Sequence, residues 1–159
     1  VVSSFRHDGV AAELLRTFKF GRMAGLAPLL AGFMAENVDA SRVGTVVVPV
    51  PSAALRRRIR GFDPAALLAE AVTGSDRGVG AAGSQAAVIR RVGRGRQRGR
   101  DRVARLADPP RSVPVGSVSG PVLLVDDVIT TGATLAACAA ALRRCGGGPV
   151  TAVSFTRRV

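Results

Sequence analysis

The chain has little of what several classes of protein require. Its 159 residues include no tryptophan or tyrosine, one histidine and two cysteines. Cys138 and Cys145 stand seven residues apart in a segment with a helical pattern, which suits neither a disulfide framework nor a CxxC metal ribbon. We therefore expect both to be structural thiols, predict no zinc site, and take His7 for an ordinary surface residue.

Long apolar runs are also missing. Even Val122–Val125 is followed at once by two aspartates, and no run approaches the roughly 18 to 20 residues that a membrane span needs. The N-terminus lacks the pattern of a signal peptide. With an apolar content of 47%, the sequence predicts one globular domain without a membrane span, located in the cytoplasm.

Positive charge, by contrast, is abundant. The net charge is +12 from 23 basic residues, among which Lys19 is the only lysine. A pI near 11.8 favours anionic partners, either a phosphorylated small molecule or nucleic acid. Eight arginines fall between residues 90 and 105, with three glycines and one acid, Asp101. This segment is expected to be a mobile basic loop.

The spacing of apolar residues predicts an α/β fold with a parallel sheet. Helical spacing marks residues 10–20 and 26–34, and Asp63 and Pro64 resemble the N-cap and first position of a later helix. The further expected elements are strands at 45–50, 86–89, 122–125 and 150–155 and helices at 65–72 and 132–144. Strands that alternate with helices form parallel sheets.

The segment Val122–Thr134 carries the clearest chemical pattern. Asp126 and Asp127 follow the expected strand at its C-terminal end, where ligands of open parallel sheets bind. Residues 130–134 then offer backbone N–H groups, hydroxyls and the start of a helix to a phosphate. Paired carboxylates suit ribose hydroxyls or hydrated Mg²⁺. The alternative is that Asp126 caps the turn and Asp127 is solvated, without a ligand.

These thirteen residues resemble the motif of type I phosphoribosyltransferases that binds 5-phosphoribosyl-1-pyrophosphate (PRPP). Further segments resemble the ComF family of that superfamily: Leu15–Gly21, Val48–Pro51 and Arg60–Phe62, with Arg90, Gln97 and Arg105 at the family's spacing. The chain differs at Asp63, Pro64 and Asp108, where the family commonly has asparagine or glutamine.

The resemblance implies a type I phosphoribosyltransferase-like fold. Residues 1–44 would form a small N-terminal helical hood, and residues 45–159 the core with a flexible basic loop at about 90–111. The implied reaction transfers phosphoribose from PRPP to an unidentified nitrogen acceptor and releases pyrophosphate. The assembly is left open, with a homodimer as one option.

The same resemblance assigns roles to single residues. Asp126 and Asp127 would orient the ribose and hold Mg²⁺, directly or through water, while Arg60, Arg90 and Arg105 would neutralise the leaving group. The 5-phosphate would bind to Thr130, Thr131, Gly132, Ala133 and Thr134. Pyrophosphate would bind to Pro49, Val50, Pro51 and Ser52, with Lys19 and Gln97 as further ligand contacts.

A second class of function stays open. The fold could serve as a non-catalytic sensor of PRPP or nucleotides, or as a competence factor in DNA uptake whose basic loop at 90–105 binds single-stranded DNA. That loop has no aromatic residue on which a base could stack. Nonspecific recruitment of RNA or acidic proteins by the basic surface is the least favoured alternative.

Overall fold

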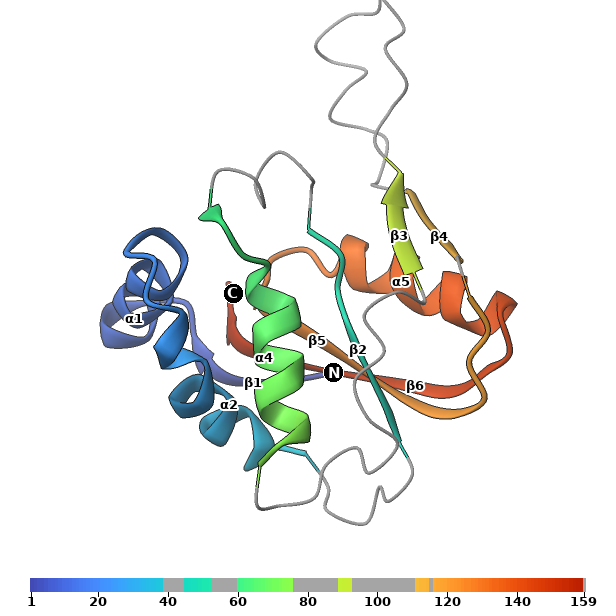
Figure 1. Ribbon diagram of the computed structural model, residues 1–159, viewed down its shortest axis with the longest axis horizontal. Coiled ribbons are helices and arrows are strands. Elements are labelled where there is room, and N and C mark those ends of the chain that lie inside the picture. Colours follow the sequence, from blue (N-terminus) through green and yellow to red (C-terminus); the bar gives the residue numbers. More distant parts are fainter. Residues whose placement is uncertain (39–44, 53–59, 76–88, 93–110, 115, 159) are drawn as a thin grey trace, which may run out of the picture.

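A four-stranded sheet forms the centre of the molecule. The structure, a computed structural model, describes residues 1–38, 45–52, 60–75, 89–92, 111–114 and 116–158. The strands β1 (Val2–Arg6), β6 (Gly147–Arg157), β5 (Gly120–Ile129) and β2 (Val46–Pro49) lie in this spatial order. Each neighbouring pair is parallel. The expected α/β fold, with a parallel sheet flanked by helices, is confirmed (Figure 1).

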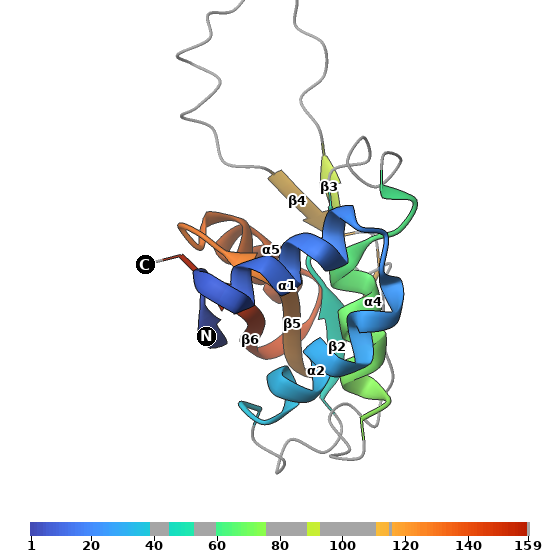
Figure 2. The same ribbon diagram turned by 90° about the vertical axis from the view of Figure 1, so that its left-hand side faces the viewer.

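Helices cover both faces of this sheet. One face carries α1 (Gly9–Phe20), the short 3-10 helix η1 (Ala24–Leu26), α2 (Ala27–Ala35) and α4 (Pro64–Thr73). The other face carries α5 (Ala133–Arg144). Figure 2 shows α1 and α2 on the near side of the strands, next to α4. Among the described helices, none is long and apolar enough to cross a membrane.

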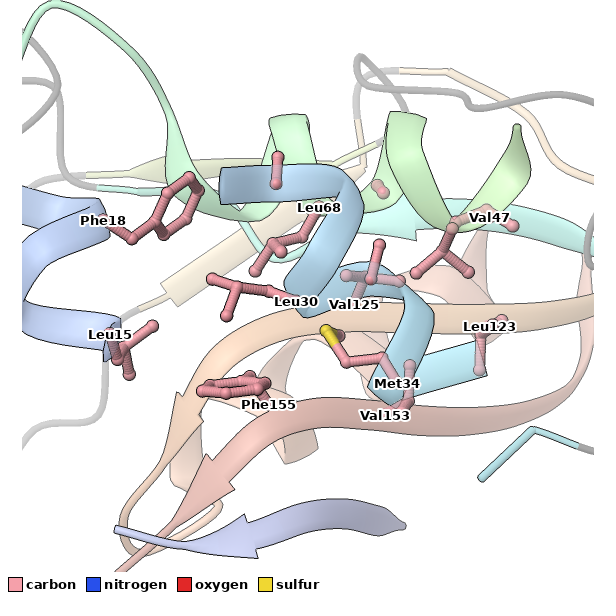
Figure 3. Packing of buried hydrophobic residues seen from close by; sticks show 14 residues of the cluster. Leu15, Phe18, Leu30, Met34, Val47, Leu68, Leu123, Val125, Val153 and Phe155 are labelled. Atoms are coloured by element: carbon pink, nitrogen blue, oxygen red, sulfur yellow. The ribbon is translucent and has the colours of Figure 1, made fainter. Parts of the chain in front are cut away.

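The central strands are apolar because both of their faces are buried. Leu123 and Val125 of β5 pack against the helices α2 and α4, whereas Val122 and Leu124 pack on the side of α5. Figure 3 shows the first of these clusters, in which Leu30 and Met34 of α2 lie against strand residues such as Phe155. The alternation along β5 therefore fixes which of its side chains face each layer.

Two helices of the core, α4 and α5, begin as the sequence predicts. The Asp63 carboxylate caps α4 by accepting the Ala65 N–H at 3.2 Å, and Pro64 occupies the first helical position. Helix α5 follows Gly132, whose φ of 76° is a left-handed conformation that favours glycine. The two cysteines, one buried and one half-buried, are not joined in a disulfide.

Three expectations about secondary structure need correction. The N-terminal segment is not only helical, because Val2–Arg6 forms the edge strand β1 beside β6. Strand β5 runs on to Ile129, so both aspartates lie inside the strand and not beyond its end. Finally, the segment expected to be a basic loop has a strand at each end.

The two ends of that basic segment are strands. Ile89–Val92 (β3) and Arg111–Pro114 (β4) pair in an antiparallel two-stranded sheet. Arg90 therefore belongs to a strand, and the strand expected at 86–89 overlaps β3 only at Ile89, since residues 86–88 lie outside the described residues. Residues 93–110, to which most of the expected loop belongs, also lie outside them.

Candidate functional site

A polar cavity of about 270 Å³ opens where β2 and β5 end. Four separate parts of the chain meet there: the last turn of α1, the residues after β2, the start of α4 with Arg60 before it, and the end of β5 with the following turn. Its lining residues are Lys19, Val50, Pro51, Ser52, Arg60, Ala65, Asp126, Asp127, Val128, Thr130 and Thr134. Nine of the residues proposed from sequence are in this set, which the fold thus brings together.

The two aspartates line the cavity together. Neighbouring positions of a strand normally point to opposite faces. The Asp126 carboxylate accepts the N–H of the following residue, Asp127, at 2.8 Å, which keeps it beside its neighbour. Burial, and then the charge of Asp127, raise the pKa of Asp126 to about 8. The chain therefore holds Asp126 in surroundings that disfavour its ionised form.

Lys19 is the counter-ion of the second aspartate. Its Nζ lies 2.7 Å from Oδ2 of Asp127, and both side chains are almost fully buried, with 13% and 11% exposed. Lys19 comes from the last turn of α1, so this ion pair joins the N-terminal helices to the central strand. The residue expected to contact a ligand thus lines the cavity, and its partner is an acid of the site.

The turn after β5 divides between two cavities. Thr130 and Thr134 line the polar cavity, whereas Thr131 and Gly132 line a second cavity on the side of α5. The Thr131 Oγ1 accepts the Ala133 N–H at 3.4 Å, and Gly132, the N-cap residue, has no side-chain acceptor. An anion near Thr130 and Thr134 would therefore also meet the positive end of the α5 dipole.

The residues after β2 form the opposite wall. Val50 donates its N–H to the Val125 carbonyl at 2.8 Å, so the loop leaves the sheet in a fixed position. Ser52 Oγ donates to Asp63 Oδ1 at 2.9 Å, the same oxygen that caps α4. Pro49 is buried within β2 and does not line the cavity. Asp63, which departs from the family's pattern, thus connects the loop with the start of α4.

Arg60 lines the cavity and packs over the ring of Phe20, a contact that the sequence did not predict. Its guanidinium carbon lies 5.0 Å from the centroid of the Phe20 ring, and Phe20 is 66% exposed. Beside it, the rings of Phe18 and Phe62 pack with centroids 5.4 Å apart. Phe20 follows Lys19 directly, so the last turn of α1 contacts two charged groups of the site.

The remaining sequence-predicted residues are not placed in the cavity. Ala133 is exposed at the start of α5 and does not line it. Arg90 lies in β3 of the second sheet, and only its backbone is described. Gln97 and Arg105 lie outside the described residues. Their proposed roles at the leaving group stay predictions.

The described residues provide no protein cage for a metal. No group of three or more histidine, cysteine, aspartate or glutamate side chains comes together in this part of the chain. The two aspartates are the acidic oxygen donors of the cavity. This donor set suits Mg²⁺ held mainly by phosphate oxygens and water, as the ion usually is at phosphate sites.

Comparisons with known proteins give a partial likeness to a solved structure. No protein-family model matches the chain, and no curated protein matches it. Among solved structures, it is similar to the crystal structure of phosphoribosylpyrophosphate synthetase from Mycobacterium smegmatis, with 26% identity and a TM-score of 0.44. The match covers 81% of this chain and 33% of the synthetase chain, so this chain spans about a third of that protein's length.

Proposed function

We propose that the chain binds PRPP in the polar cavity and transfers its phosphoribosyl group to a nitrogen acceptor, with release of pyrophosphate. One observation carries this proposal. A pair of carboxylates, a hydroxyl-bearing turn at a helix start and a loop with an arginine face one cavity. These groups match the three parts of PRPP, namely the ribose, the 5-phosphate and the pyrophosphate. The sequence resemblance to the ComF family supports the same assignment.

Each part of PRPP has its own wall of the cavity. Asp126 and Asp127 accept hydrogen bonds from the ribose hydroxyls. Thr130, Thr134 and the first N–H groups of α5 bind the 5-phosphate. The Ser52 N–H in the loop after β2 and the Arg60 guanidinium bind the pyrophosphate.

The proposed reaction needs no nucleophilic side chain. The lone pair of the acceptor nitrogen forms the bond to C1 of the ribose, the bond from C1 to the pyrophosphate oxygen breaks, and its electron pair leaves with pyrophosphate. The acceptor nitrogen releases its proton to water. Arg60 stabilises the negative charge that grows on the leaving group, which is the electrostatic role that fixed donors have in enzymes.

The cavity fits a magnesium ion that enters with the pyrophosphate. When bound, Mg²⁺ would neutralise charge on the leaving oxygens. Asp126 and Asp127 would hold it, directly or through water. Without ligand, Lys19 supplies the positive charge next to Asp127.

Calorimetric titration of PRPP tests this function, with and without Mg²⁺. We expect binding to the wild type and a loss of at least tenfold in affinity for the Asp126→Asn, Asp127→Asn double variant, because removing hydrogen bonds to charged groups costs about 1.5–3 kcal/mol each. Glu70→Gln removes an exposed charge on α4 and should bind like the wild type.

Pyrophosphate release with a panel of nitrogen acceptors then separates an enzyme from a sensor. PRPP binding without release for any acceptor would support a non-catalytic sensor. If the wild type does not bind PRPP at millimolar concentration, or if the double variant binds it equally well, the proposal is wrong.

A further inference from the structure

A basic cavity lies beside the proposed PRPP site. It has a volume of about 340 Å³ and is lined by Arg6, His7, Asp8, Arg157 and Arg158. Its lining contains three arginines and one aspartate, so the cavity carries net positive charge. None of the roles proposed above uses these residues.

The register of the sheet places this basic cavity next to the ribose site. Arg6 pairs with Arg157 across β1 and β6, and Arg157 pairs with Ile129 across β6 and β5. One position earlier, Thr156 pairs with Val128, which lines the polar cavity. The ends of β6 and β5 that border the two cavities are therefore neighbours in the sheet, with their backbones roughly 5 Å apart.

Backbone hydrogen bonds hold the floor of the basic cavity in place. The His7 N–H donates to the Arg157 carbonyl at 2.8 Å, and the Arg158 N–H donates to the Ile129 carbonyl at 2.8 Å. The His7 Nδ1 lies 2.9 Å from Oγ1 of the buried Thr156. The ladder of the sheet thus continues beyond the strand ends and fixes the three segments relative to one another.

Two of the arginines, Arg157 and Arg158, have no acidic partner among the described residues. Asp8 lies 3.2 Å from Nε of Arg6, so it balances that arginine. In the described part of the chain, no acid forms an ion pair with Arg157 or Arg158. Burial, followed by the charges of Arg158 and Lys19, lowers the pKa of His7, and Asp127 acts on it in the opposite direction. Lys19 and Asp127, which line the polar cavity, therefore influence the pKa of His7 in the basic cavity.

The order of the strands decides which part of the reaction this cavity can serve. Strand β2, whose following loop binds the pyrophosphate in the proposed function, lies on one side of β5. Strands β6 and β1 lie on its other side. A nucleophile that displaces pyrophosphate from C1 must approach from the side opposite to the leaving group. The acceptor therefore enters from the side of β6 and β1, where the basic cavity is.

We propose that the acceptor is a nitrogen compound that carries a carboxylate, and that Arg157 and Arg158 bind this carboxylate in the basic cavity. A planar guanidinium binds a carboxylate through two parallel N–H bonds, which gives direction as well as affinity. The neutral His7 ring, held by Thr156, adds a polar group beside it. This inference rests on the proposed function, because it places the acceptor relative to the ribose.

Matched pairs of ligands test the inference. Pyridine and pyrimidine carboxylates, each paired with its own carboxamide, differ in charge but hardly in shape. We expect NMR titration of the wild type to show at least one carboxylate that binds about tenfold or more tightly than its amide, as for a hydrogen-bonded charge. The Arg157→Gln, Arg158→Gln double variant should lose this preference. Arg143→Gln, which removes an exposed charge outside the basic cavity, should keep it.

PRPP titrations of the same proteins keep the two proposals apart. All three proteins should bind PRPP with equal affinity, since the basic cavity does not hold it. The inference is overturned if no carboxylate exceeds its amide, if the preference survives in the double variant, or if that variant also loses PRPP. Failure of the wild type to bind PRPP would instead overturn the proposed function, whatever the carboxylates do.

Discussion

The end of β5 and the turn that follows it have a polar side and an apolar side. Asp126, Asp127 and Thr130 line the polar cavity, whereas Leu124 and Ile129 of the same strand line the second cavity, of about 380 Å³. The second cavity also takes Leu135 and Ala139 from α5, so most of its wall is apolar. One short stretch of chain therefore builds two surfaces with opposite chemistry.

The difference in lining between the two cavities indicates that the polar one is the ligand site. A larger apolar side chain can fill an apolar cavity without leaving a buried polar group unpaired. Buried charges, in contrast, cost free energy unless they are paired, and even a good pair is seldom better than apolar residues. The polar cavity retains two adjacent aspartates with one lysine, which stability alone would not favour.

The largest effect should come from breaking the ion pair of the polar side. Lys19→Met keeps most of the length of the side chain but leaves the Asp127 carboxylate buried without a counter-ion. We expect the free energy of unfolding to fall by about 3–5 kcal/mol, measured by urea denaturation at pH 7. Arg16→Met, which breaks the exposed pair with Glu13, serves as the control and should show little change. Equal losses in both variants would contradict the assigned role of Lys19.

A smaller effect is expected from the raised pKa of Asp126. Between its ordinary pKa of 3.8 and about 8, the folded state binds more protons than the unfolded state. Stability should therefore fall as pH rises through this range. Asp126→Asn removes the group, so the variant should have a flatter profile and be more stable by about 1–3 kcal/mol at pH 8.

Urea unfolding at several pH values between 4 and 8 provides this comparison, without ligand or Mg²⁺. Glu70→Gln, the exposed control, should follow the wild-type profile. Parallel profiles for the wild type and Asp126→Asn would show that Asp126 titrates normally.

The smallest effect should appear on the apolar side. Ala139→Leu partly fills the second cavity and should raise the free energy of unfolding by about 0.5–1 kcal/mol, with PRPP affinity unchanged. Ala65→Leu, at the wall of the polar cavity, should instead weaken PRPP binding in the calorimeter. The contrast fails if filling the apolar cavity reduces PRPP affinity as much as filling the polar one.

The sequence predicts those parts of the site that are contiguous in the chain. Four apolar residues, two acids and a turn with Gly132 lie within thirteen positions, so their local pattern is sufficient to predict a strand, a turn and a helix start. The same holds for α4, because Asp63 and Pro64 stand directly before it. Local patterns do not predict which cavity each side chain will line. Thr131, for example, is expected at the phosphate but lines the apolar cavity.

Features that depend on distant pairing could not be predicted. Val2–Arg6 contains two serines and an arginine, with Val2 and Phe5 partly exposed, and it is a strand because β6 offers its edge. The ion pair of Lys19 with Asp127 and the hydrogen bond of His7 with Thr156 likewise join opposite ends of the chain. His7, expected to be an ordinary surface residue, lines a cavity for this reason.

The position of β6 also has a consequence for how the protein acquires its structure during synthesis. Strand β6, at residues 147–157, lies between β1 and β5 and is the neighbour of both. Strand β1 therefore has no neighbour in this sheet until residues near 150 have been synthesised. Contacts between residues so far apart close large loops and slow folding. Helices α1 and α2 share their apolar cluster with β5 and β6, so part of their apolar surface stays uncovered until then, which exposes the nascent chain to aggregation.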